Sequence, residues 1–139
     1  MKKSELNLTA LINSFNTLKE CYQDYSNEKN EKIKGYIKDS CIQRFEYTYE
    51  SAKKIMNKYL KKEYDKTEKD LAINNIFREM LGLGLLNNFE NWIDYREKRN
   101  VTSHEYNDKW TYPILEIIPQ FIEDVDFLIK SLNEVLEDD

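Results

Sequence analysis

Residues 99–106 read Arg-Asn-Val-Thr-Ser-His-Glu-Tyr and hold three side chains suited to chemistry at a phosphate group. Arg99 carries a planar fork of N–H donors that matches phosphate oxygens. His104 is the only histidine among the 139 residues, and an imidazole moves protons near neutral pH. Tyr106 offers a hydroxyl group that can form a hydrogen bond or be modified. This octet, residues 99–106, is therefore the first candidate for a functional site.

The spacing within the octet makes a prediction about the backbone. Arg99 and His104 are five positions apart, which places them about 140° apart around one ideal α-helix. In an unbroken helix the two side chains would diverge. Thr102 and Ser103 are residue types that favour the start of a new turn, so we expect an interruption or a frayed helical stretch that turns both side chains toward one pocket.

The spacing alone also fits a plainer interpretation of the octet. Arg99 would make a surface ion pair with Glu97 or Glu105, and His104 would be an exposed loop residue. Short patterns of this kind occur by chance in many sequences, so the pattern needs a structural context before it carries a function.

Apolar residues recur at steps of three and four along most of the chain, which indicates amphipathic helices. Thr67 and Asp70 resemble the start of a helix, and Gly82 and Gly84 are natural stop signals. The predicted helices span about 4–25, 31–64, 67–81, 87–99 and 112–136.

Two further signals concern the last two predicted helices. Asn87 or Asn88 can cap the helix that reaches at least Arg99. Pro113 suits the first turn of the last helix, whereas Pro119 lies further in and should kink it.

The composition agrees with an all-α fold. Gly totals 3 and Pro 2, and no segment shows the alternation of a half-buried strand. We predict one domain over residues 1–139, an up-and-down antiparallel four-helix bundle with a short extra helical segment and a kinked last helix. Tyr22, Tyr25, Phe45 and Trp92 fit a dimer face and core packing equally well.

The net charge of −5 argues against a general electrostatic grip on nucleic acid, although it permits a small basic pocket. Four lysines form one stripe late in the second predicted helix, where a solvated face is the favoured interpretation and a path for RNA the alternative. In the middle of that helix Arg44 either holds a phosphate or pairs with Glu46 or another helix. The four lysines of the stripe late in this helix are Lys54, Lys58, Lys61 and Lys62.

Cys21 and Cys41 form no metal-binding pattern and are expected to be buried free thiols in a reducing cytoplasm. The N-terminal stretch has no signal-peptide pattern, and no stretch suits a membrane span. We also find no acid pair in the setting of a metal site, no Walker loop and no dinucleotide fingerprint, so no metal or cofactor is expected.

The octet resembles the motif of the HEPN superfamily and, within it, of the nucleotidyltransferase substrate-binding (HepT-like toxin) family. That motif is an arginine, four to six residues, a histidine, any residue and a tyrosine, with a polar residue such as Asn100 after the arginine. The segment Gln43–Glu50 is similar to the family's second-helix segment, and Trp92–Asn107 is similar to its fourth. The resemblance covers nearly the whole chain.

The resemblance implies a metal-independent ribonuclease that works as a homodimer. Two copies of the motif would face each other across a cleft, so that one His104 acts as base and the other as acid. Arg99 would stabilise the charge on the phosphorane, and Asn100 would orient the histidine or the phosphate.

The resemblance also implies a partner protein, a minimal nucleotidyltransferase, in a toxin–antitoxin pair. That partner would attach AMP to Tyr106, and the added charge and bulk would block RNA entry. The sequence leaves two alternatives open. The chain could be a non-catalytic subunit that presents a substrate to the nucleotidyltransferase, or an inert helical scaffold.

Overall fold

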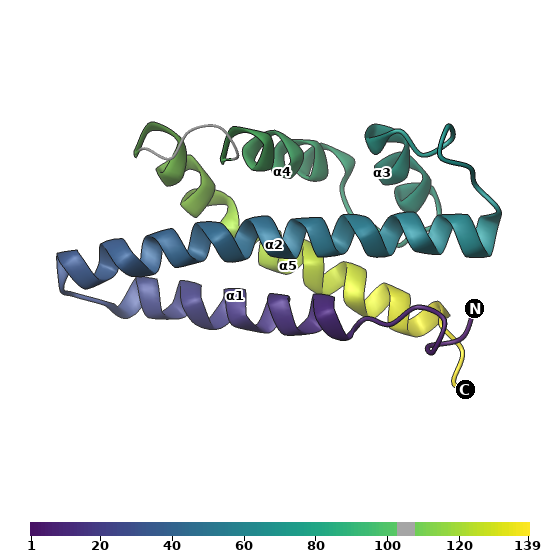
Figure 1. The fold of residues 1–139 in the computed structure, drawn as a ribbon, viewed down its shortest axis with the longest axis horizontal. Helices are drawn as coiled ribbons and strands as arrows, with labels where there is room; N and C mark the ends of the chain where they lie inside the picture. The colour runs from purple at the N-terminus through teal and green to yellow at the C-terminus, as the bar shows by residue number, and fades with distance from the viewer. Residues whose placement is uncertain (103–107) are drawn as a thin grey trace.

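The computed structural model describes residues 1–102 and 108–139, whose arrangement is shown in Figure 1. The all-α class predicted from the sequence is confirmed, and the described residues contain no strand beyond an isolated bridge between Lys2 and Glu137. The described helices are α1 (Thr9–Asn27), α2 (Glu31–Tyr64), α3 (Ile73–Gly82), α4 (Phe89–Thr102) and α5 (Asp108–Val135).

The long helix α2 is the axis of the molecule. Its 34 residues correspond to about 50 Å, and it contacts each of the other described helices. In Figure 1, α1 lies along one side of α2 while α3 and α4 lie on the opposite side. α5 packs against α1, α2 and α4, and α3 is the short extra helix beside α2 and α4. The up-and-down order of a four-helix bundle stays a prediction.

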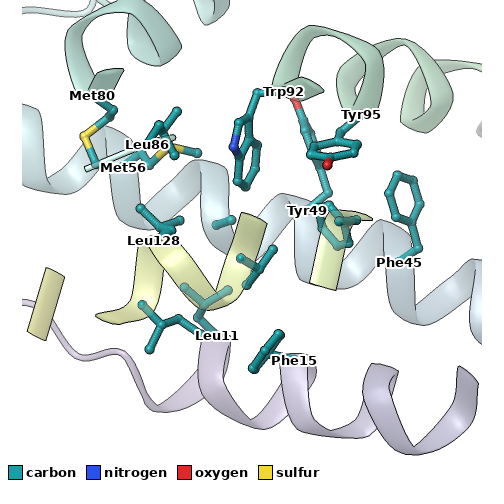
Figure 2. Close-up of a cluster of buried hydrophobic side chains, with 14 of the residues drawn as sticks. Leu11, Phe15, Phe45, Tyr49, Met56, Met80, Leu86, Trp92, Tyr95 and Leu128 are labelled. Atoms are coloured by element: carbon teal, nitrogen blue, oxygen red, sulfur yellow. The ribbon is translucent and has the colours of Figure 1, made fainter. Parts of the chain in front are cut away.

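An aromatic cluster forms the centre of the core (Figure 2). The ring of Trp92 on α4 is fully buried, and its centroid lies 5.3 Å from that of Tyr95 and 5.8 Å from that of Phe77. Tyr49 of α2 and Phe121 of α5 complete the contacts around the indole. Trp92 therefore belongs to the core, and so does the fully buried Phe45; neither forms a dimer face.

The helix caps explain several boundaries that the sequence predicted. Asn88 caps α4, since its Oδ1 accepts a hydrogen bond of 2.8 Å from the backbone N–H of Asn91. Gly84 has a φ of 76°. The N–H of Gly84 bonds to the carbonyl of Leu81, and that of Leu85 bonds to the carbonyl of Met80. These are the two bonds of a Schellman motif, which ends α3.

Three helices begin at other residues than the sequence pattern suggested. α1 begins at Thr9, where the Asn7 side chain accepts from the Thr9 N–H, and not near Ser4. The reciprocal hydrogen bonds between Thr67 and Asp70 form as predicted, but they close only a turn, and α3 begins later, at Ile73.

The last helix, α5, begins at Asp108 and not near residue 112. Pro113 therefore lies in its second turn and not in its first. Pro119 is also inside α5, where its ring removes one helical N–H donor. In Figure 1 the green first turns of α5 descend more steeply than its yellow remainder, as a proline kink predicts.

Candidate functional site

Arg99 lies on the face of α4 that points toward α2. Trp92 and Tyr95 occupy the same face and are fully buried. Arg99 follows Tyr95 by four residues, or about one turn, and it reaches the edge of the core with a side chain 25% exposed. The core face of α4 thus leads from buried rings at one end to a cation at the other.

Two acidic residues of α2 hold the guanidinium of Arg99. Its Nε lies 3.4 Å from Oε1 of Glu50, and its Nη1 lies 4.0 Å from Oε2 of Glu46. The two glutamates are one turn apart on α2, so they approach the guanidinium side by side. Both distances are those of ion pairs rather than of the short, paired hydrogen bonds of a bidentate contact.

A groove of about 510 Å³ lies beside this ion-pair cluster. It is formed by α1, α2 and α4, and Tyr47, which is 62% exposed, stands at its rim. The groove joins a second one of about 590 Å³ through three shared residues, and together they follow the surface between α1 and α2. The shared residues are Ala10, Gln43 and Tyr47, and the first groove also contains Leu11, Glu46, Glu50, Ser51, Lys54, Ile55 and Arg99.

The structure brings only some of the predicted site residues together. Arg99 and Glu46 meet in one cluster, with the exposed Asn100 next to Arg99 on α4. Arg44 does not line the Arg99 groove; its Nε donates to Oγ of Ser40, and it lines the neighbouring groove.

His104 and Tyr106 lie outside the described residues, as does Glu105 of the plainer alternative. The predicted interruption does not include residues 99–102 or 108–110, because α4 extends to Thr102 and α5 begins at Asp108.

A buried polar network anchors the beginning of α4 to α5. Oδ1 of Asp124 accepts a 3.0 Å hydrogen bond from Nδ2 of Asn87, and Oδ2 accepts one of 3.0 Å from Nδ2 of Asn91. The hydroxyl of Tyr95 also donates to Oδ2. Burial raises the pKa of Tyr95, and the hydrogen bond to Asp124 raises it further, so the phenol stays protonated. Asp124 is 3% exposed, and three donors satisfy it.

Sequence reasoning missed two residues that the structure shows to matter. Glu50 is the closer acidic partner of Arg99, and its spacing of four from Glu46 on one helix was the available signal. Asp124 sits within the apolar stripe of α5, between Phe121 and Leu128, and an acid at a core position indicates a buried network.

The structure places two lysines of the predicted stripe beside other groups. Lys61 forms an ion pair with Glu68, and Lys54 lines the Arg99 groove.

Cys21 and Cys41 are buried free thiols with their sulfur atoms 3.1 Å apart, and burial raises the pKa of the Cys41 thiol. Among the described residues, no group of three or more His, Cys, Asp or Glu side chains could hold a metal ion. None of the described helices is long and apolar enough to cross a membrane.

Comparison with known proteins shows the family to which this chain belongs. The profile of the family described as nucleotidyltransferase substrate binding protein like matches residues 6–134. The chain is 28% identical over 141 aligned residues to a protein of Haemophilus influenzae named probable ribonuclease HepT, covering 96% of this chain and 97% of that protein.

Two solved structures have a similar fold. One, from Haemophilus influenzae, is described as revealing the fold of a substrate-binding domain of a nucleotidyltransferase; its TM-score is 0.83 at 27% identity, over 91% of this chain and 99% of that one. The other, from Thermus thermophilus, has a TM-score of 0.73 at 22% identity, over 88% of this chain and 98% of that one, and supports the fold alone. The chain belongs to the nucleotidyltransferase substrate binding protein-like family.

Proposed function

We propose that this member of the nucleotidyltransferase substrate-binding family is a metal-independent ribonuclease toxin of the HEPN type. The observation that carries the proposal is the position of Arg99, in the last turn of α4 and just before the segment that contains His104. Glu46 and Glu50 hold the Arg99 side chain at a groove. The near-full-length similarity to a protein named probable ribonuclease HepT supports the same activity.

The proposed reaction uses the 2′-hydroxyl of RNA as the nucleophile. One histidine removes the 2′ proton while the oxygen attacks the adjacent phosphorus, and the bond from phosphorus to the 5′ oxygen breaks. A second histidine protonates the departing 5′ oxygen, which leaves a 2′,3′-cyclic phosphate and a 5′-hydroxyl. Arg99 stabilises the charge that grows on the phosphate oxygens, and Asn100 orients the phosphate or the histidine.

The need for a base and an acid supports a homodimer. Each chain has one histidine, His104, and an imidazole with an ordinary pKa near 6.5 serves either role near neutral pH. A two-fold dimer brings two copies of one surface together and so supplies both groups.

The proposed regulation acts on Tyr106. A minimal nucleotidyltransferase, the antitoxin partner, transfers the AMP group of a nucleoside triphosphate to the Tyr106 hydroxyl and releases pyrophosphate. The added phosphate carries negative charge to a position two residues from His104, where it repels the RNA backbone. Mass spectrometry after incubation with the partner and ATP should find one adenylate on the wild type and none on Tyr106→Phe.

The test of the activity is cleavage of labelled RNA by purified protein in excess EDTA. An intact-mass measurement first establishes that Tyr106 is unmodified. We expect cleavage by the wild type, and a loss of about 100-fold or more for His104→Ala and Arg99→Ala. Lys98→Ala is the matched control, because Lys98 is the neighbouring cation on α4 and pairs with Asp94 of the same helix. Equal cleavage by wild type and His104→Ala would contradict the proposal.

A second candidate function is a non-catalytic subunit that presents a substrate to the nucleotidyltransferase. The family description and the Haemophilus influenzae fold favour it, and so do Glu46 and Glu50, since carboxylates beside Arg99 weaken its attraction for phosphate. This candidate predicts no RNA cleavage by unmodified protein together with a stable complex with the nucleotidyltransferase in size-exclusion chromatography.

A further inference from the structure

A second groove continues the Arg99 groove along the surface between α1 and α2. Its described lining residues come from these two helices, and we call it the Arg44 groove after the cation that it contains. Ala10, Gln43 and Tyr47 line both grooves. A molecule bound at Arg99 can therefore extend directly into the Arg44 groove.

The lining of the Arg44 groove differs in charge from the rest of this acidic chain. The net charge of the chain is −5, yet the described residues that line this groove include one cation, Arg44, and no carboxylate. The other polar groups are hydroxyls and amides, which form hydrogen bonds with phosphates, sugar hydroxyls and base edges. These polar residues are Asn13, Ser14, Thr17, Ser40 and Gln43. The groove therefore favours a ligand that is anionic and rich in hydrogen-bonding groups.

Arg44 is an exposed residue whose guanidinium is oriented by a neutral neighbour. Its Nε donates a hydrogen bond of 3.2 Å to Oγ of Ser40, one turn earlier on α2. This bond uses one of the five N–H donors of the guanidinium. Among the described residues no carboxylate pairs with Arg44, whereas two glutamates hold Arg99. Arg44 thus keeps donors for a phosphate that Arg99 shares with its acidic partners.

Tyr47 presents an aromatic ring where the two grooves meet. Its side chain is 62% exposed and lines both of them. Arg44, Tyr47 and Glu50, the closer partner of Arg99, follow one another on α2 at steps of three residues. The six residues from Arg44 to Glu50 correspond to about 9 Å along the helix, or about three nucleotides at a stacked spacing of about 3.4 Å. The ring therefore lies between two cations at a spacing that suits a short single strand.

A third groove, of about 330 Å³, limits the length of this path. It meets the Arg44 groove at Arg44 and contains Glu20 and Asp24 of α1. Two carboxylates repel phosphate groups, so a strand that comes from the Arg99 groove should end its contacts at Arg44.

We propose that the Arg44 groove binds the single-stranded RNA next to the scissile phosphate. Tyr47 stacks on the neighbouring base, which suits a base of any type, and Arg44 binds the phosphate beyond it. The hydroxyls and amides of the groove bond to the sugar and to the base edge. The proposal rests on the proposed ribonuclease function and adds to it a substrate subsite with a defined direction, from Arg99 along α2 toward Arg44.

The first experiment tests the stacking residue by fluorescence anisotropy. A short labelled single-stranded RNA is bound to the full-length His104→Ala protein, and Tyr47→Ala is added to it. Binding should weaken about tenfold, while Tyr47→Phe should bind within about twofold because phenylalanine keeps the stacking face. Alanine favours the helix, and the replaced side chain is exposed, so the variant should fold.

Tyr36 provides the matched control for Tyr47. It is also 62% exposed and also on α2, but it lines the third groove with the two carboxylates. Tyr36→Ala should bind RNA within about twofold of the parent. Equal weakening by Tyr36→Ala and Tyr47→Ala, or no weakening by Tyr47→Ala, would overturn the proposal.

The second experiment tests the phosphate contact through its salt dependence. Arg44→Ala should lower the slope of log Kd against log salt by about 0.7, the contribution of one phosphate contact on a single strand. Arg78→Ala removes the same charge from an exposed position on α3, on the other side of α2 from α1, and should leave the slope unchanged (Figure 1). Equal changes in both variants would show attraction by overall charge alone and would refute the subsite.

Cleavage kinetics separate this inference from the proposed function. In the active protein, Arg44→Ala and Tyr47→Ala should each raise KM about tenfold, with the smaller change in kcat. An unchanged KM with normal cleavage would refute the subsite and leave the ribonuclease intact. Normal RNA binding by both variants, with loss of the complex with the nucleotidyltransferase, would assign the groove to that protein and refute the subsite. If the wild type neither binds nor cleaves RNA, the ribonuclease proposal fails and the subsite with it.

Discussion

The two ends of α4 differ in how the rest of the molecule holds them. At its beginning, Asn88 caps the helix, Asn91 and Tyr95 bond to the buried Asp124, and Trp92 is enclosed by rings from other helices. At its end, Arg99 is held by two carboxylates at a groove. The first end is fixed by packing and buried hydrogen bonds, whereas at the second end two carboxylates orient a cation that stays accessible.

A small helical protein can present a cation at the end of a helix that is anchored elsewhere. Ion pairs near the surface contribute little to stability, so Glu46 and Glu50 orient Arg99 without holding the helix in place. The burial of Trp92 and the Asp124 network hold it. Changes at the first end should therefore act on stability, and changes at the second should act on function.

The largest expected effect comes from Trp92→Ala at the anchored end. Removing a fully buried indole should lower the free energy of unfolding by about 4 kcal/mol, because the space cannot close completely. Urea unfolding followed by circular dichroism measures the change. A loss below about 1 kcal/mol would mean that this end does not depend on the aromatic cluster.

The Asp124→Ala variant should be next in size. It leaves the amides of Asn87 and Asn91 and the hydroxyl of Tyr95 without their buried acceptor, at a cost of about 3 kcal/mol. Asp124→Asn, which keeps the shape and one acceptor oxygen, should lose less. Equal stability of Asp124→Ala and wild type in urea unfolding would contradict the anchoring role of the network.

A smaller effect is expected at the turn that leads into α4. Gly84→Ala should lower the free energy of unfolding by about 1 kcal/mol, because its φ of 76° is unfavourable for a residue with a Cβ. Gly82→Ala is the matched control, since Gly82 is helical and has room for a Cβ. Gly82→Ala should be neutral or stabilising by up to about 1 kcal/mol. Thermal unfolding of the two variants and the wild type measures both changes. The reverse order would rule out the Schellman motif as the stop of α3.

The smallest effect on stability belongs to the accessible end. Arg99→Ala should change the free energy of unfolding by less than about 1 kcal/mol, as partly exposed ion pairs usually do. Its cleavage activity should nevertheless fall about 100-fold. Urea unfolding and RNA cleavage, measured on one preparation, test the small change in stability and the large loss of activity together. A loss of activity that only mirrors a loss of folded protein would remove the contrast between the two ends.

The sequence predicted the helical class and several boundaries because these depend on local chemistry. The bounds of α2, the Asn88 cap and the stop at Gly84 follow from periodicity and from residue types with known backbone preferences. The start of α3 was wrong because the bonds between Thr67 and Asp70 are equally compatible with a single turn.

The candidate site was less predictable, because its partners come from different helices. Arg99 and Asn100 were identified by the motif, but the pairing of Arg99 with Glu50 depends on how α4 packs on α2. The Arg44 groove likewise depends on how α1 packs on α2. Such contacts are decided by tertiary packing, which no local pattern in one sequence encodes.

The most direct test of the central claim, that Arg99 and His104 cleave RNA through its 2′-hydroxyl without a metal, is the mass of the RNA fragments. A defined oligoribonucleotide is incubated with unmodified protein in excess EDTA, and its products are measured by mass spectrometry. We expect fragments ending in a 2′,3′-cyclic phosphate, formed by the wild type and absent with His104→Ala. Fragments ending in a 3′-hydroxyl, or identical products from both proteins, would contradict it.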